Sequence, residues 1–304
     1  MRRSHLLVSV LQRDDVESSW THGTDAVILD LADSVPASAK GQAREMVRES
    51  IPIAARGGAE VFVRVNKPLL HADVEASVWP GLVGIVHPNA EAGAEIEEEE
   101  AILEEMEKRR GIAMGTLQII VLLDTGKGVW NVREIIKANP RVCSVGLDES
   151  NLCRNLGIVP DPEFDPFVYT KGRIVIEGTA ARVQPVGISH PYGALPRFGD
   201  AEEVHRLILR GRNLGFKGTI CPHSSWVELC NRAYTPTEEQ VAYYREVRQL
   251  FSEGVARGTA AVPYRDTGRM IDVPVDERAR MIIGLWERCA ARETEKAAAL
   301  ERAR

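Results

Sequence analysis

This chain of 304 residues lacks several features that mark whole classes of protein. Its five cysteines form no Cys-x-x-Cys pair, so neither a disulfide framework nor a zinc site is expected. No run of about 18 apolar residues is present, which argues against a membrane-spanning helix. The first apolar stretch, residues 6–11, is too short for the core of a signal peptide. We therefore expect a cytoplasmic protein with reduced, mostly buried thiols and no membrane partner.

Net positive charge is missing as well. The net charge is −6 and the isoelectric point is near 5.8, whereas domains that bind nucleic acids usually present a basic surface. Hydrophobic residues make up 44% of the chain, which is enough for a sizeable core. A globular protein with a small-molecule substrate therefore fits this composition better than a protein with a nucleic-acid partner.

Short apolar segments alternate with stretches that have helical spacing. A short apolar run bounded by turn residues is typical of a strand buried on both faces, as in a parallel sheet covered by helices. No Gly-x-Gly-x-x-Gly follows the first segment, so the α/β fold expected is a (β/α)8 or TIM barrel rather than a doubly wound sheet. The eight expected strands are residues 6–11, 26–31, 60–65, 82–86, 117–123, 142–147, 183–188 and 218–221.

The pattern changes after the eighth expected strand. Residues 237–254 and 276–300 have the spacing of helices, and residues 258–272 resemble a hairpin. We therefore expect a (β/α)8 catalytic domain over residues 1–233. A C-terminal helical segment over residues 234–304 would follow, large enough to serve as a lid and a subunit contact.

Charged residues lie where the second and third expected strands end, and in such barrels chemistry is done at these ends. Asp30 and Asp33 follow the second strand, while alternation along the third puts Arg64 and Asn66 on one face. An arginine inside a barrel is unfavourable unless it meets an anion. Arg64 therefore either forms a salt bridge with Asp30 or Asp33, or captures a substrate carboxylate or carbonyl.

Oxygen ligands also follow the fifth and sixth expected strands. Asp124 ends the fifth strand, and Asp148, Glu149 and Asn151 follow the sixth. Mg²⁺ binds one or two protein carboxylates together with waters and substrate oxygens, so two such neighbouring strand ends form a plausible magnesium site. Asp124 taken alone could equally be an ordinary helix cap. Prolines make residues 148–169 resemble a loop, and a loop of this length is often functional.

Three histidines, His87, His190 and His223, also lie at strand ends. They have no short ligand spacing, so a transition-metal site is not indicated, and most of them are expected to be hydrogen-bonded in the barrel wall. His87 and His223 are candidate substrate contacts. Asp272 lies between apolar neighbours in the C-terminal segment, where a buried or capping role is the plain alternative to a chemical one.

Seven motifs, taken in order, make the chain resemble a known family from Ser4 to about Trp286. It resembles the citrate lyase β-subunit-like branch of the HpcH/HpaI aldolase superfamily, whose members include malyl-CoA, citramalyl-CoA and other hydroxyacyl-CoA lyases. The motifs are Asp25-Ala-Val-Ile-Leu-Asp-Leu-Ala-Asp-Ser-Val, Val63-Arg-Val-Asn, Gly84-Ile-Val-His-Pro, Leu122-Leu-Asp-Thr-Gly-Lys-Gly-Val, Gly215-Phe-Lys-Gly-Thr-Ile-Cys-Pro-His, Tyr234-Thr-Pro-Thr-Glu-Glu-Gln and Gly268-Arg-Met-Ile-Asp-Val-Pro.

The resemblance implies a (β/α)8 barrel with a C-terminal lid, assembled as a homotrimer or hexamer. It also implies Mg²⁺-dependent cleavage or formation of a carbon–carbon bond next to a thioester. Arg64 corresponds to the substrate-binding arginine of the family. Asp124 and Asn151 correspond to its metal-binding glutamate and aspartate. Asp272 corresponds to a lid aspartate that serves a neighbouring subunit as an acid/base.

The metal ligands implied by the resemblance are altered in this chain. Asp124 is shorter than glutamate and Asn151 is neutral, so Mg²⁺ affinity should fall unless Asp148 or Glu149 takes the place of Asn151. The residues expected to support the metal site from a second layer are Asp30, Asp33 and Asn66.

Other positions depart from the family too. Ala32 stands where relatives carry an acid, and Asn89 stands where they carry a lysine. Val10-Leu-Gln replaces a Val-Pro-Gly turn that helps to form the CoA-binding mouth. We therefore expect a lyase acting on a 3-hydroxyacyl-CoA of malyl, citramalyl or citryl type. The alternatives are an aldolase acting on a free hydroxy-oxo acid, a thioesterase, or a non-catalytic barrel subunit.

Overall fold

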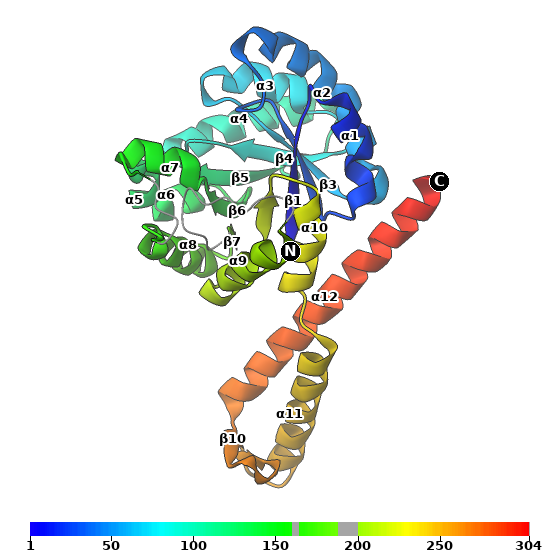
Figure 1. The fold of residues 1–304 in the computed structure, drawn as a ribbon, viewed down its shortest axis with the longest axis vertical. Coiled ribbons are helices and arrows are strands. Elements are labelled where there is room, and N and C mark those ends of the chain that lie inside the picture. Colours follow the sequence, from blue (N-terminus) through cyan, green and yellow to red (C-terminus); the bar gives the residue numbers. More distant parts are fainter. Residues whose placement is uncertain (160–163, 188–199, 304) are drawn as a thin grey trace. The chain divides into compact units, whose positions relative to one another are not determined.

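The computed structural model describes residues 1–159, 164–187 and 200–303. Eight parallel strands form one sheet in the order β7-β6-β5-β4-β3-β2-β1-β8, with helices around it (Figure 1). Backbone hydrogen bonds from Gly187 to Gly218 (2.9 Å) and from Lys217 to Pro185 (2.9 Å) join its two edges, so the expected (β/α)8 barrel is confirmed. The strands are β1 (Ser4–Ser9), β2 (Ala26–Asp30), β3 (Glu60–Arg64), β4 (Leu82–His87), β5 (Gln118–Leu123), β6 (Val142–Leu147), β7 (Gln184–Val186) and β8 (Thr219–Cys221).

Helices follow the strands as the alternating pattern predicts, with one correction. The segment expected to be a loop over residues 148–169 contains a helix, α7, and reaches the start of α8. Asp148 caps the first turn of α7, and Gly157 ends it in the left-handed conformation (φ 67°) that favours glycine. The helices of the barrel are α1 (Arg13–Ser19), α2 (Lys40–Ala54), α3 (Leu70–Ser77), α4 (Gly93–Arg110), α5 (Gly126–Trp130), α6 (Val132–Lys137), α7 (Glu149–Leu156), α8 (Val168–Ala181), α9 (Ala201–Leu214) and α10 (Ser225–Tyr234).

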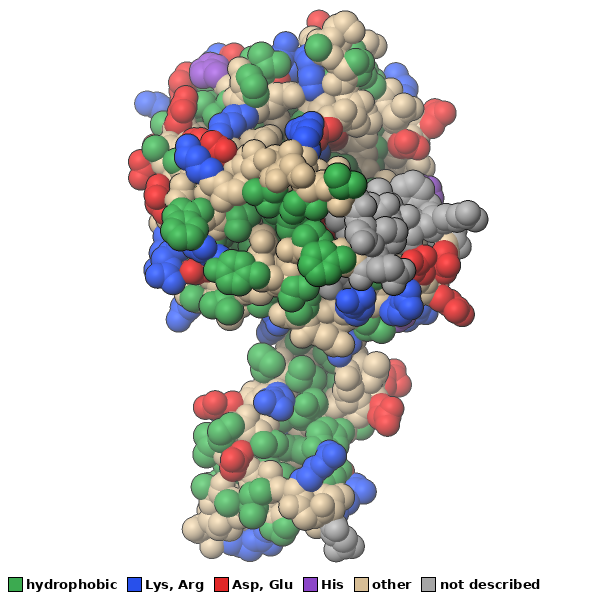
Figure 2. Space-filling model, turned by 60° about the vertical axis from the view of Figure 1, so that its left-hand side comes forward, with side chains coloured by type: hydrophobic (Ala, Val, Ile, Leu, Met, Phe, Trp, Pro, Cys, Tyr) green, Lys and Arg blue, Asp and Glu red, His purple; other side chains and the backbone are tan. Residues whose placement is uncertain are grey.

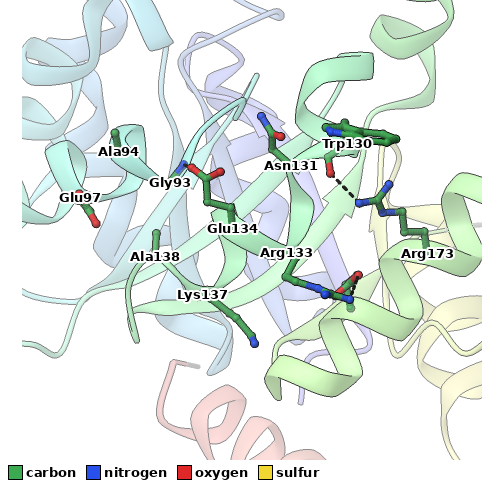
Figure 3. Close-up of a pocket in the computed structure, with 11 residues that line it drawn as sticks. Gly93, Ala94, Glu97, Trp130, Asn131, Arg133, Glu134, Lys137, Ala138 and Arg173 are labelled. Carbon is green, nitrogen blue, oxygen red and sulfur yellow. Dashed lines mark hydrogen bonds and ion pairs between the residues drawn. The ribbon is translucent and has the colours of Figure 1, made fainter.

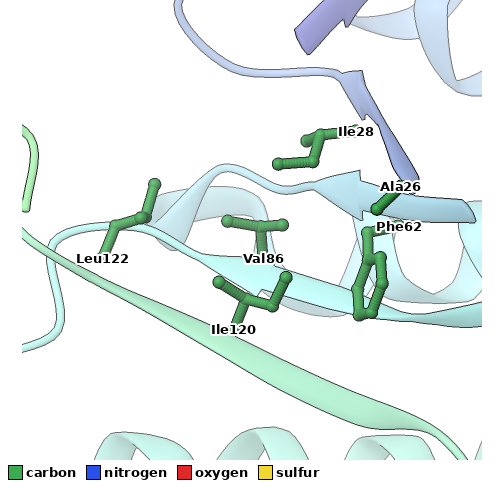
Figure 4. Packing of buried hydrophobic residues seen from close by; sticks show 6 residues of the cluster. All are labelled: Ala26, Ile28, Phe62, Val86, Ile120 and Leu122. Atoms are coloured by element: carbon green, nitrogen blue, oxygen red, sulfur yellow. The ribbon is translucent and has the colours of Figure 1, made fainter. Parts of the chain in front are cut away.

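The inside of the barrel is filled by apolar side chains. Alternation along each strand sends every second residue inward, and residues paired in register lie at the same level. The buried cluster shown in Figure 4 takes its side chains from β2 to β5, and Leu7 and Ile220 pack against it. Its members are Ala26, Ile28, Phe62, Val86, Ile120 and Leu122. This apolar layer closes the barrel below the strand ends where polar residues were expected.

Buried charges hold the N-terminal side of the barrel together. Asp25, just before β2, is fully buried and accepts hydrogen bonds from the Arg3 guanidinium (2.7 and 2.8 Å). Lys296, near the end of the chain, lies 2.9 Å from the same carboxylate and also donates to the Gly23 carbonyl. A buried carboxylate between two cations is well compensated, so this cluster ties the C-terminal residues to the barrel.

Residues 232–295 form a second compact unit. It contains α11 (Glu238–Ala256), an antiparallel pair made of β9 (Val262–Tyr264) and β10 (Arg269–Ile271), and most of α12 (Val273–Ala303). A capping box between Thr237 and Gln240 starts α11. The core of this second unit consists of Val247, Phe251, Val262, Ile271 and Ala279.

Two expectations from composition can also be compared with the structure. All five cysteines are free thiols, and only Cys143 among them is partly exposed. Within the described part of the chain, no helix combines the length and the hydrophobicity needed to cross a membrane.

Candidate active site

Charged residues form the layer next to the interior apolar cluster, on the C-terminal side of the strands. Asp30 and Arg64 are paired in register. Asp30 lies two residues after Ile28 of the cluster, and Arg64 lies two residues after Phe62. Asp124 likewise lies two residues beyond Leu122. Their side chains therefore face the barrel interior, as the alternation of the sequence predicts.

Arg64 is almost completely buried, with 6% of its surface exposed. Its Nη2 donates to Asp33 (2.6 Å) and lies 3.6 Å from Asp148. Burial opposes its charge, but the carboxylates of Asp30, Asp33 and Asp148 outweigh this effect and raise the pKa of Arg64. Its Nε is buried without a hydrogen-bond partner in the described residues, so one donor of the guanidinium is left for a ligand.

Asp124 is fully buried, and in the described structure neither of its carboxylate oxygens has a hydrogen-bond partner. Burial and the neighbouring charge of Asp148 raise the pKa of Asp124 to about 6, against the opposing effects of Arg64 and of the nearby Asn89 backbone amide. The helix-cap alternative does not hold for Asp124, because Thr125 caps α5 by accepting a hydrogen bond from the Gly128 amide (3.0 Å). A buried carboxylate without a hydrogen-bond partner is typical of a cation-binding site.

Asp148 and Asn151 lie together at the start of α7. Asp148 accepts hydrogen bonds from the backbone amide of Asn151 (3.0 Å) and from its side-chain Nδ2 (3.1 Å). Glu149 faces away from this pair, because it forms an ion pair with the buried Lys171 (3.1 Å), which also binds Asp165 (2.8 Å). The arrangement favours Asp148 and Asn151 over Glu149 as possible metal ligands.

The residues expected to support the site hold the loop that follows β2. Asp30 accepts hydrogen bonds from the backbone amides of Ala32 (2.9 Å) and Ser34 (3.0 Å). Asn66 donates to the Leu31 carbonyl (2.8 Å) and accepts from Lys40 (2.8 Å). Asp33 is two-thirds exposed at its side chain, and its hydrogen bond to Arg64 is therefore open to exchange with a ligand.

The histidines occupy different environments. Val86 packs inside the barrel, so its neighbour His87 points outward, where it is hydrogen-bonded to Glu99 (2.6 Å) on α4. We leave His87 out of the proposed substrate site because of this outward direction. His223 is exposed after β8, and its Nδ1 contacts the hydroxyl (2.8 Å) and the amide of Ser225 at the start of α10. His190 lies outside the described residues.

Asp272 belongs to the second unit. Its Oδ1 accepts a hydrogen bond from the Val275 amide (3.2 Å) at the start of α12, and the side chain is partly exposed. Within the described chain, Asp272 therefore acts as a cap of α12, which is the alternative stated from the sequence. Its role as a lid acid stays a prediction.

The oxygen ligands near Arg64 fit Mg²⁺ better than a softer metal. Among the residues that the structure covers, no group of three or more His, Cys, Asp or Glu side chains is arranged to hold a metal. Two carboxylates, Asp124 and Asp148, with the amide of Asn151 beside them, match the small number of protein ligands that Mg²⁺ takes. The unsatisfied oxygens of Asp124 are the observation that supports this fit.

Two surface features lie outside the barrel mouth. A groove of about 820 Å³ runs between α4, α6 and α8 (Figure 3), where Arg133 pairs with Glu177 and Arg173 donates to the Trp130 carbonyl. Large exposed apolar side chains lie beside it, and Figure 2 shows hydrophobic side chains gathered on one face of the molecule. Those on and next to α8 are Trp130, Val168, Tyr169 and Ile176.

Sequence reasoning overlooked three residues near the site. Ser9, the last residue of β1, could have been found by alternation from Leu7. Lys40 holds the loop after β2, and Lys171 holds Glu149. The sequence gives no local signal for either lysine, because each contacts residues of another element.

A family model described as HpcH/HpaI aldolase/citrate lyase matches residues 3–223, which span all eight strands of the barrel and the carboxylates at their ends. The chain belongs to this family. The citrate lyase subunit beta of Leuconostoc mesenteroides subsp. cremoris is 26% identical over 288 residues, covering 94% of this chain and 93% of that protein. The L-malyl-CoA/beta-methylmalyl-CoA lyase of Rhodobacter capsulatus is 25% identical over 282 residues, covering 85% and 86%.

A solved structure shares the fold of this chain. CitE from Mycobacterium tuberculosis, in complex with magnesium, acetoacetate and coenzyme A, superposes with a TM-score of 0.69 at 22% identity, covering 93% of this chain and 97% of that one. Family membership and the lyase relatives confirm the expected class, so the protein is an enzyme of the carbon–carbon lyase type.

Proposed function

We propose that this protein is a Mg²⁺-dependent lyase that cleaves or forms a 3-hydroxyacyl-CoA of malyl, citramalyl or citryl type. The observation that carries the proposal is the pair of buried groups left unsatisfied at the barrel mouth. Arg64 offers an unused Nε and Asp124 two unused carboxylate oxygens within the described structure. An anionic substrate together with a cation would satisfy both groups. The malyl-CoA lyase among the relatives and the CitE complex with magnesium and coenzyme A support a Mg²⁺-dependent reaction on a CoA thioester.

The proposed chemistry needs positive charge at the barrel mouth. Cleavage next to a thioester leaves an enolate, whose negative charge must be stabilised. Bound Mg²⁺, held by Asp124, Asp148 and Asn151, would supply Lewis-acid stabilisation there. Arg64 adds a fixed cation whose guanidinium is oriented by Asp33 and Asp148, so little reorganisation is needed during the reaction.

The proposal includes a lid and an oligomer. The enolate carbon must receive a proton after cleavage, and an acid carried by a lid can do this once the site is closed. We assign this role to Asp272, supplied by a neighbouring subunit of a homotrimer or hexamer. The exposed Trp130, Tyr169 and Ile176 are consistent with subunit contacts, because large apolar surfaces often mark protein interfaces.

A second activity is supported by one departure from the family. Val10-Leu-Gln replaces the turn that helps to form the CoA mouth in relatives, and Val10 is buried while Gln12 is exposed. An aldolase acting on a free hydroxy-oxo acid would use the same Arg64 and carboxylates without a CoA mouth. A thioesterase would release the thiol instead of a second thioester.

The test is a product analysis with malyl-CoA, citramalyl-CoA and citryl-CoA in the presence of Mg²⁺. A lyase yields an oxo acid and a second thioester, whereas a thioesterase yields free CoA thiol. Asp124→Asn should abolish cleavage, while Asp14→Asn, an exposed carboxylate on α1, should leave it unchanged. Cleavage of a free hydroxy-oxo acid but of none of the thioesters would instead establish the aldolase.

A further inference from the structure

Ser9 faces the inside of the barrel. It lies two residues after Leu7, which packs against the interior cluster, and side chains alternate along a strand. The register pairs Ser9 with Asp30, and Asp30 with Arg64. Ser9 therefore lies at the level of Arg64, on the next strand but one.

The hydroxyl of Ser9 takes no part in the hydrogen bonding of the described residues. The residue is half-buried, but its Oγ is buried and makes no hydrogen bond within the described chain. Arg64 Nε, at the same level, is likewise unsatisfied. Asp30 between them is already satisfied by the amides of Ala32 and Ser34. Since a buried polar group without a partner is unfavourable, two donors at one level indicate an oxygen acceptor that the described residues do not supply.

The position of Ser9 separates it from the proposed metal ligands. In the strand order, β1 lies across the barrel from β5, which carries Asp124 at its end. The carboxylates of Asp124 and Asp148 suit a cation, whereas Ser9 and Arg64 present hydrogen-bond donors. Donors of this kind suit an oxygen that gains negative charge during a reaction.

We propose that Ser9 Oγ donates a hydrogen bond to the thioester carbonyl oxygen of the substrate, next to Arg64. This inference rests on the proposed lyase function and deepens it by assigning the donors for that oxygen. In the cleavage step, the bond between the hydroxyl-bearing carbon and the carbon next to the thioester breaks, and its electron pair forms the enolate. The hydroxyl proton passes to a base as the new carbonyl forms, and the enolate carbon then takes up a proton.

The test isolates enolate formation from the rest of the reaction. Acetyl-CoA and propionyl-CoA are incubated in D₂O with the full-length protein, Mg²⁺ and oxalate, and deuterium uptake next to the thioester is followed. Ser9→Ala should slow this exchange by about 10- to 100-fold, because a donor to the developing negative charge is lost. Ser9→Thr, which keeps the hydroxyl, should exchange at close to the wild-type rate.

Oxalate affinity in the presence of Mg²⁺ provides the second readout. The affinity of Ser9→Ala for oxalate should stay within about twofold of the wild type, since oxalate would bind beside Asp124 and Asp148, away from Ser9. Ser18→Ala on α1 is the matched control. Should Ser9→Ala fold poorly, Ser9→Cys gives the same test with a weak donor of similar size. Equal exchange in wild type and Ser9→Ala, or weaker oxalate binding in Ser9→Ala, would overturn the role of Ser9 alone. No exchange in the wild type with either thioester would instead overturn the proposed lyase function together with this role.

Discussion

Arg64 Nη2 lies 3.6 Å from Asp148 Oδ2 at the barrel mouth, although Arg64 ends β3 and Asp148 directly follows β6. The same guanidinium nitrogen donates to Asp33, whose side chain is 66% exposed, while the side chain of Asp148 is 22% exposed. Because the Asp33 carboxylate is largely exposed to water, its contact with the buried Arg64 can be exchanged for a substrate oxygen at low cost. Asp148 keeps the guanidinium oriented during that exchange.

Replacement of Arg64 should therefore affect catalysis more than folding. We expect Arg64→Lys to lower kcat/KM for the best hydroxyacyl-CoA substrate by about 100-fold, because lysine keeps the charge but loses the fork of donors. Steady-state kinetics measure the effect. Arg44→Lys, which alters an arginine paired with Asp73 outside the barrel mouth, is the control. Unchanged kcat/KM in Arg64→Lys would show that the guanidinium does not bind the reacting group.

A second prediction concerns the neutral residue among the proposed metal ligands. Asn151→Asp adds a carboxylate beside Asp148, so Mg²⁺ should bind about 10-fold more tightly, as measured by calorimetry in the presence of oxalate. Without Mg²⁺ the same variant should have a lower Tm, because like charges replace the hydrogen bond from Asn151 to Asp148. Asn213→Asp, an exposed change on α9, should alter neither quantity. Equal Mg²⁺ affinity in Asn151→Asp would remove residue 151 from the metal site.

Periodicity in the sequence was sufficient to place the strand-end charges. Apolar runs that end in Asp30 and Asp124 have the length of buried strands, and alternation correctly turns Arg64 inward. The start of β1 was placed two residues too late, because Ser4 and His5 are polar yet paired with β8. Strand extent depends on pairing partners as well as on hydrophobicity.

The local arrangement around Asp148 was only partly predictable. The prolines in residues 148–169 led to the prediction of a loop. The N-cap Asp148 and the C-cap Gly157 together indicate a short helix instead. The pairing of Glu149 with Lys171 joins two helices, and no local pattern reports such a contact. The outward direction of His87, in contrast, follows from Val86 by alternation and could have been predicted.

His87 should make stability depend on pH. Burial lowers the pKa of His87, but Glu95 and Glu99 outweigh this effect and raise it from 6.5 to about 9. Because the folded-state pKa is the higher one, the contribution to the free energy of unfolding is complete below about pH 6.5 and is lost as pH rises through 9. His87→Gln should remove this contribution, about 3 kcal/mol, and with it the pH dependence of stability between pH 6.5 and 9.

Urea denaturation at pH 6, 7.5 and 9 measures the difference between His87→Gln and the wild type. The difference should shrink as pH rises, and His71→Gln, an exposed histidine on α3, should show no such trend. A difference that is constant with pH would mean that His87 is neutral in the folded protein.

The cluster of Arg3, Asp25 and Lys296 should be essential for stability. Asp25→Asn leaves two buried cations without their carboxylate, so the free energy of unfolding should fall by about 3–5 kcal/mol. Asp14→Asn, an exposed change on α1, should shift it by less than about 0.5 kcal/mol. Chemical denaturation provides both values. A loss as small as that of the control would indicate that water reaches the cluster.

The final prediction tests whether two subunits share one active site. If Asp272 serves the barrel of a neighbour, Arg64→Lys and Asp272→Asn damage different halves of each shared site. Each variant should be nearly inactive alone, whereas subunits mixed after mild dissociation should regain activity, because some sites then combine an intact Arg64 with an intact Asp272. Glu277→Gln, an exposed neighbour of Asp272 on α12, should stay active by itself. Mixtures that remain inactive, with mixed oligomers verified by mass spectrometry, would place Asp272 in the site of its own chain or outside catalysis.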